Sequence, residues 1–119
     1  MRSFRFESLS VWQHALEISD GLLDVAETLS ERHYYRFAEQ LRGATMSITN
    51  NIAEGSGADN NKEFDSFLRY ARRSAFECVN ILLLCVRRGL VEEQTKDVLH
   101  EKLDILCRQI TRFRQSLKP

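Results

Sequence analysis

Hydrophobic residues recur every three or four positions along four long stretches of the chain, which is the spacing of an amphipathic helix. This pattern predicts helices over residues 10–29, 34–54, 61–88 and 92–117. No stretch alternates between apolar and polar residues as a half-buried strand would. The most regular stripe is the last one, a heptad seam made by Leu99, Leu103, Leu106, Ile110, Phe113 and Leu117.

Residues that favour helix ends flank most of these stretches. Ser10 is a predicted N-cap with Gln13 as its capping-box partner, and Asn60 caps the third helix. Gly55 is expected just beyond the end of the second helix, and Gly89 just beyond the third. The segment "SERHYY" between the first two helices carries no strong helix-breaking signal, so that boundary is the least defined.

Four helices joined by short connections predict an all-α fold, an antiparallel up-down-up-down four-helix bundle, as a single domain over residues 1–119. Some helices carry apolar residues beyond one stripe, such as Leu22 with Leu23, the run "ILLLCV", and Val98 with Leu99. A lone bundle needs only one apolar face on each helix. The surplus therefore predicts self-association into a homo-oligomer.

Composition fits a soluble protein of the cytoplasm. Of the 119 residues, 43% are hydrophobic and 29% charged, and the only proline is the last residue. No apolar run reaches the roughly 18 residues of a membrane span, and the N-terminus lacks the apolar core of a signal peptide. Cys78 and Cys85 lie too far apart on one helix for a disulfide, and Cys107 has no evident partner, so free, buried thiols are expected.

Charge is balanced overall but uneven along the chain. Residues 1–60 carry five Lys/Arg against nine Asp/Glu, and residues 61–119 carry twelve against eight. The basic half fits a solvated face complemented by the acidic half or by a neighbouring subunit. It also fits a surface for nucleic-acid phosphates, although zero net charge does not favour a nucleic-acid binder.

The sequence contains no complete motif for catalysis or cofactor binding. "DVLH" (residues 97–100) has the carboxylate-x-x-His spacing of a di-metal bundle site, but no second copy exists. There is no CxxC pair, and "GSG" at 55–57 follows a helix, whereas a phosphate-binding loop precedes one. Ser47 and Ser74 have no histidine nearby in sequence to activate them. We therefore predict no enzymatic activity, no cofactor, no metal and no small-molecule substrate.

A polar stripe runs beside the apolar one in the second helix, through Gln40, Ala44, Ser47, Asn51 and Glu54. In the third helix Arg73, Glu77 and Asn80 share a face, with Ser74 adjoining. The two stripes predict a hydrogen-bonded network that fixes the register of helices or subunits. A ligand or nucleic-acid contact and simple solvent exposure remain alternatives.

Three segments resemble the signature of a known family. "FESLSVWQHA" is similar to its N-terminal motif, "QLRGATMSITNNIAEG" to its central motif, and "FDSFLRYARRSAFE" to the block that follows. The central segment matches at Gln40, Leu41, Arg42, Ala44, Ser47, Ile48, Asn51, Ile52, Ala53, Glu54 and Gly55, and Glu77 matches in the third. The chain thus resembles the four-helix-bundle proteins named after the intervening sequences of 23S ribosomal RNA genes.

The resemblance implies a four-helix bundle assembled as a ring-like homopentamer, with no established enzymatic activity and a suggested nucleic-acid role. The fold also resembles the basic, nucleic-acid-binding pentameric accessory protein of diversity-generating retroelements. Two departures are visible: Gly43 stands where the family usually has a second arginine, and the connection near residue 33 lacks the family's Phe-Pro segment. Both weaken the case for nucleic-acid contact at that end of the bundle.

The leading hypothesis is a homo-oligomeric binding or assembly module with RNA or DNA as partner. The residues expected to contact phosphate are Arg69, Arg72, Arg73, Arg108, Arg112, Arg114 and Lys118. The competing hypothesis is a structural or protein-interaction scaffold without a nucleic-acid partner, which neutral charge and surplus apolar surface favour.

Overall fold

The computed structural model describes residues 3–119 and is all-α over that range, with four long helices. A short 3-10 helix, η1 (Arg5–Ser8), precedes α1 (Ser10–Glu31), α2 (Tyr35–Ser56), α3 (Asn61–Arg87) and α4 (Glu93–Ser116). The four helices predicted from the hydrophobic spacing are confirmed, with ends that differ by one or two residues. No helix in this part of the chain is both long enough and apolar enough to cross a membrane.

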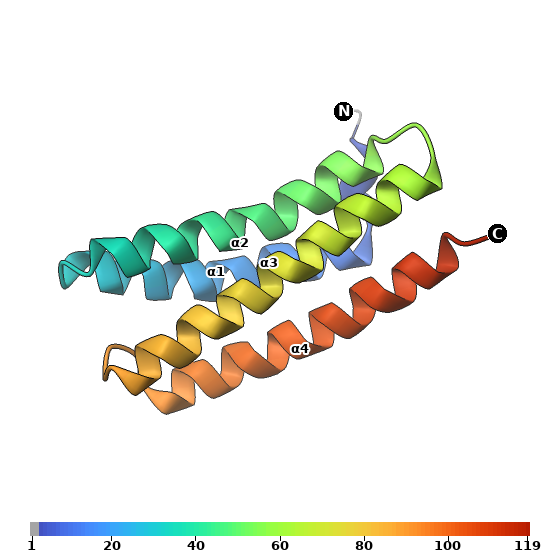
Figure 1. Cartoon of the computed structure of the whole chain (residues 1–119). Helices are drawn as coiled ribbons and strands as arrows, with labels where there is room; N and C mark the ends of the chain where they lie inside the picture. The colour runs from blue at the N-terminus through green and yellow to red at the C-terminus, as the bar shows by residue number, and fades with distance from the viewer. Residues whose placement is uncertain (1–2) are drawn as a thin grey trace.

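The helices lie lengthwise beside one another in a body of 46 × 29 × 20 Å (Figure 1). α1 packs against α2 and α4, and α3 packs against the same two helices. α1 and α3 therefore occupy opposite corners of the bundle. Contact is most extensive between α2 and α3, whereas α4 packs less extensively on either neighbour.

One cluster of buried apolar side chains runs through the middle of the bundle and includes residues of all four helices. The narrow stripe of α2 is buried at Leu41, Thr45, Ile48 and Ile52. The heptad seam of α4 is buried at Leu99, Leu103, Leu106 and Ile110. The hydrophobic period therefore identified the core-facing side of both helices correctly.

The predicted role of Gly55 as a residue beyond the end of α2 is wrong. The helix continues through Gly55 to Ser56, and Gly57 follows as its C-cap. A Cβ atom on Gly55 would lie 2.7 Å from Cβ of Phe67 and 2.8 Å from Cδ1 of Phe64. Gly55 is needed because α2 and α3 approach each other too closely for any side chain there.

The two predicted N-terminal caps have different outcomes. Asn60 caps α3 as expected, because its Oδ1 accepts a hydrogen bond from the backbone N–H of Glu63 at 2.9 Å. Ser10 is instead the first residue of α1, and Leu9 occupies the N-cap without a side-chain hydrogen bond. The side chain of Gln13 donates to the carbonyl oxygen of Glu7 in η1, at 2.8 Å.

The ends of α1 and α3 share one geometry. Gly89 has φ +71° and His33 has φ +70°, and both follow the last helical turn. In each case the next residue donates a backbone hydrogen bond five positions back at 2.8 Å, from Tyr34 to Leu29 and from Leu90 to Cys85. This is the Schellman motif, which glycine usually completes. His33 fills that position at the boundary that had no sequence signal.

Candidate nucleic-acid interface

A groove of about 680 Å³ lies between α3 and α4, where the less extensive packing of α4 leaves surface accessible. Apolar side chains from both helices line it, namely Phe76, Val79, Leu103 and Cys107. Polar and charged groups complete the lining: Arg72, His100, Asp104, Arg108, Thr111, Arg112 and Gln115. Three of the seven predicted phosphate-binding residues thus meet in one groove.

Arg72 is the most constrained of these three arginines. Its guanidinium lies over the ring of Phe76, with Cζ 4.8 Å from the ring centroid, in a cation–π contact. Its Nε is buried and has no hydrogen-bond partner among the described residues. A buried N–H without an acceptor is costly, so Arg72 occupies this position at a cost in stability.

Arg108 and Arg112 stand at the exposed edge of the groove. Arg108 Nη2 lies 3.2 Å from Oδ2 of Asp104, one turn earlier on α4. Both side chains of this pair are more than half exposed, so the pair is weak and its arginine can be recruited by another anion. Arg112 is exposed and lines a second groove as well, between η1, α1 and α4.

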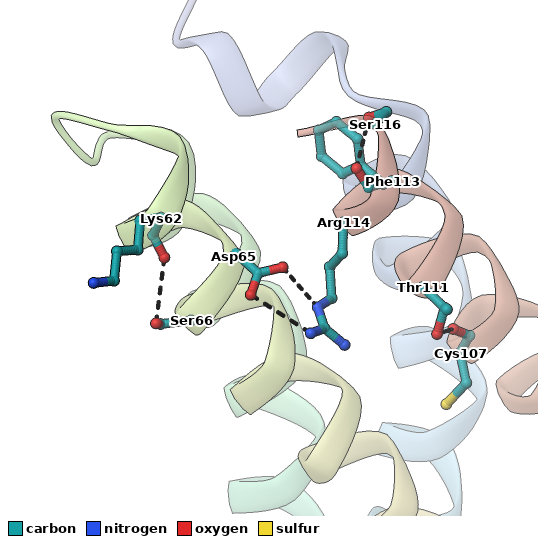
Figure 2. Close-up of polar contacts among 8 residues, drawn as sticks. All are labelled: Lys62, Asp65, Ser66, Cys107, Thr111, Phe113, Arg114 and Ser116. Carbon is teal, nitrogen blue, oxygen red and sulfur yellow. Dashed lines mark hydrogen bonds and ion pairs between the residues drawn. The ribbon is translucent and has the colours of Figure 1, made fainter. Parts of the chain in front are cut away.

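Arg114 is held by a partner within the chain. Its Nε donates to Oδ1 of Asp65 at 2.8 Å and its Nη2 lies 3.5 Å from Oδ2, so that the guanidinium reaches across to α3 (Figure 2). Both side chains are only about a quarter exposed. This pair ties the last turns of α4 to the start of α3, which is a structural role for Arg114.

The remaining predicted residues lie away from the groove. Arg69 and Arg73 are exposed on α3 and Lys118 is exposed beyond the end of α4, and none of them lines the groove. Phe76 was missing from the predicted set. The signal for it was its position four residues after Arg72, which places an aromatic ring and a guanidinium on the same helix face.

One hydrogen bond joins the polar stripes of α2 and α3. The hydroxyl of Ser74 on α3 donates to Oγ of Ser47 on α2 at 2.8 Å. Asn51 donates its side-chain amide to the carbonyl oxygen of Ser47 at 2.7 Å and to Oγ of Ser47 at 3.0 Å.

The other polar members of the family motif do not join this network. Gln40, Glu54 and Glu77 are exposed and make no side-chain hydrogen bond within residues 3–119. Arg42 pairs with Glu39 on its own helix, with Nη1 2.9 Å from Oε1. The motif thus contributes one helix–helix contact and one close approach, at Ser47 and Gly55, rather than a cluster of convergent polar groups.

The cysteines and acids do not form a reactive site in the described part of the chain. Cys78, Cys85 and Cys107 are free and buried, as predicted. Burial raises the pKa of the Cys78 thiol to about 11, against a smaller opposing effect of its hydrogen bond with Thr45. The pKa of Cys107 is also raised by burial, although nearby Arg72 opposes the shift. Residues 3–119 contain no group of three or more His, Cys, Asp or Glu side chains placed to hold a metal ion.

Comparison with known proteins identifies relatives of the whole bundle. The family model described as 23S rRNA-intervening sequence protein matches residues 7–112. A crystal structure of a protein of unknown function from the S23 ribosomal protein family of Bacteroides thetaiotaomicron superposes with a TM-score of 0.83. The match covers 87% of this chain and 97% of that one at 19% identity, so it supports the fold alone. A search of curated proteins found no match.

Proposed function

Because the chain belongs to the 23S rRNA-intervening sequence protein family, we propose that it is a non-enzymatic, cytoplasmic module that self-assembles and binds RNA. In this proposal the helices form an antiparallel up-down-up-down bundle and the bundles form a homopentameric ring. The short connections at residues 32–34, 57–60 and 88–92 support the bundle order. Large apolar side chains left exposed, such as Leu83 and Ile105, support self-assembly.

The α3/α4 groove is the observation that carries the RNA proposal. The groove is lined by three arginines but by only one carboxylate, that of Asp104. Its apolar lining and the Arg72–Phe76 stack resemble the combination that sequence-tolerant single-strand binders use, aromatic rings for bases and cations for the backbone. In a ring, RNA bound at one copy of this site would have a raised effective concentration at the neighbouring copies, so that several weak sites together would bind more tightly than one.

The test is fluorescence anisotropy of a labelled single-stranded RNA titrated with the full chain at several salt concentrations. We expect binding at low ionic strength that weakens steeply as salt rises. Replacing Arg72 and Arg112 together by alanine should weaken binding at least tenfold. The matched control is Arg36→Ala with Arg88→Ala, which removes two exposed arginines outside the groove. Absence of binding at low salt, salt-independent binding, or an equal loss in both double variants would overturn the proposal.

A scaffold without nucleic acid is the second candidate. It is favoured by the exposed apolar side chains and by the acids that already engage Arg108 and Arg114. Native mass spectrometry of the purified protein separates the two. A ring with co-purified nucleic acid supports the first candidate, and an assembly that neither carries nor takes up RNA supports the second.

A further inference from the structure

α1 presents a continuous acidic face to solvent. The helix contains no Lys or Arg, and its five acidic residues are all exposed. They step by three, four, three and four residues, which keeps them within one narrow sector of the helix. None of them forms an ion pair within residues 3–119. We call Glu17, Asp20, Asp24, Glu27 and Glu31 the acidic face of α1, and the half-exposed Leu16 borders it.

α3 presents the opposite pattern. One row of its exposed residues steps by four, three, four, three and four and combines arginines with apolar side chains, and Tyr70, Glu77 and Leu84 are exposed beside this row. Phe76 is 56% exposed and Leu83 is 46% exposed, which is unusual for side chains of this size in the middle of a helix. From Arg69 to Arg88 the chain carries five arginines against one acid, Glu77. We call Arg69, Arg73, Phe76, Asn80, Leu83 and Arg87 the basic face of α3.

The two faces cannot neutralise each other within one molecule. α1 and α3 occupy opposite corners of the bundle, each packed on α2 and α4, so their outward sides lie on opposite sides of the bundle. Two cations lie beside the acidic face, Lys102 of α4, which shares grooves with Asp24 and Glu17, and Arg32, which follows Glu31 and shares a groove with Asp24. Neither pairs with an acid of this face. The faces also have similar lengths, about 21 Å from Glu17 to Glu31 and about 27 Å from Arg69 to Arg87.

We propose that the acidic face of α1 docks on the basic face of α3 of a second copy of this chain. This deepens the self-assembly part of the proposed function, on which it rests. Charge complementarity selects the second copy as occupant, because a nucleic acid could cover the basic face but would be repelled by the acidic one. The exposed apolar residues Leu16 and Leu83 lie within or beside the two faces and would be buried when they meet, whereas the ring of Phe76 stays in the α3/α4 groove with Arg72.

The contact is heterologous, because the surface used on one copy differs from the surface used on the next. Every added copy then leaves one acidic and one basic face free until a ring closes. The proposed contact differs from that of a two-fold dimer, in which the same helix of both copies would pack together and like charges would oppose each other.

Variants of the full chain in which two charges of one face are reversed test this pairing, with self-association measured by sedimentation velocity at moderate salt. One variant carries Asp20→Lys and Glu27→Lys, and the other carries Arg69→Glu and Arg73→Glu. Each is expected to weaken self-association at least tenfold. An equimolar mixture of the two should associate again, and a chain with all four changes should recover self-association on its own. The matched control, Arg36→Glu with Glu101→Lys, reverses two exposed charges outside both faces and should assemble like the original chain.

Recovery in the four-fold variant is the decisive result, because a merely damaged fold could not produce it. The pairing is refuted if the four-fold variant stays monomeric, if only one double variant weakens assembly, or if both assemble normally. Self-assembly of the original chain, measured in the same experiment, still stands in these cases. If the original chain is monomeric, self-assembly itself fails along with this inference. An intact assembly of the original chain that does not bind RNA at low salt would overturn the RNA proposal alone.

Discussion

Ser74 on α3 donates its hydroxyl hydrogen to Ser47 on α2 across 2.8 Å, and this is the one side-chain hydrogen bond between oxygen atoms that links these two helices within residues 3–119. Oγ of Ser47 also accepts a hydrogen bond from the side-chain amide of Asn51, so the network continues along α2. The bond is half-buried and lies midway along both helices, where it fixes their relative register.

We expect Ser74→Ala to lower the free energy of unfolding by about 1 kcal/mol, the usual net value of such a hydrogen bond. For a chain of this size this corresponds to roughly 4 °C in Tm, measurable by thermal denaturation followed by circular dichroism. Ser66→Ala is the control, because Ser66 bonds only to the carbonyl oxygen of Lys62 on its own helix. Equal losses in the two variants would show that the link between helices contributes nothing.

Gly55 and Gly43 lie in the same helix, α2, and should respond in opposite directions to the same change. Gly55→Ala places a methyl group against Phe64 and Phe67, and this overpacking should cost about 1–3 kcal/mol. Gly43→Ala meets no atom within 4 Å, so the better helix propensity of alanine should stabilise the protein by up to ~1 kcal/mol. Urea denaturation of both variants measures the contrast. A stabilised Gly55→Ala would contradict the close approach of α2 and α3.

His33→Gly should stabilise the protein by about 1 kcal/mol, because glycine adopts positive φ without the steric cost that a Cβ brings. The corresponding change at the end of α3, Gly89→Ala, introduces that cost at φ +71° and should be destabilising by a similar amount. Thermal denaturation measures both effects. If His33→Gly is instead strongly destabilising, the contact between the tilted rings of His33 and Tyr35 contributes more to stability than the backbone conformation.

Arg114 and Asp65 should show measurable energetic coupling in a double-mutant cycle. With both side chains about three-quarters buried and two contacts between them, we expect a coupling of about 1 kcal/mol that falls as salt is added. The exposed pair Arg108–Asp104, on α4 alone, is the comparison and should give no more than roughly 0.5 kcal/mol. A stronger coupling in the exposed pair would contradict the assignment of Arg114 to holding α4 on α3.

Features encoded by local chemistry were predictable from the sequence. The 3.6-residue period identified the buried sides of α2 and α4, and the Asn60 cap and the glycine at 89 marked real helix ends. Features that depend on how two helices approach each other were not. Gly55 has the same sequence context as an ordinary terminating glycine, and only the proximity of Phe64 and Phe67 reveals its packing role.

The candidate site shows the same division. Sequence separated the basic half of the chain from the acidic half, but it could not tell which arginines converge. Arg72, Arg108 and Arg112 meet because α3 and α4 lie side by side, whereas Arg114 has an acidic partner 49 positions away. Phe76 joins the site through its stacking with Arg72.

The diagonal placement of α1 and α3 has a consequence for the protein as a charged particle. Its formal charge is zero, yet α1 carries five acids and no Lys or Arg, whereas α3 at the opposite corner carries five Lys and Arg against three acids. The two helices therefore separate charge across the width of the bundle. Copies that approach side by side in solution will be oriented by this separation of charge before they touch. An isoelectric point near neutrality therefore does not mean that the surface is evenly charged.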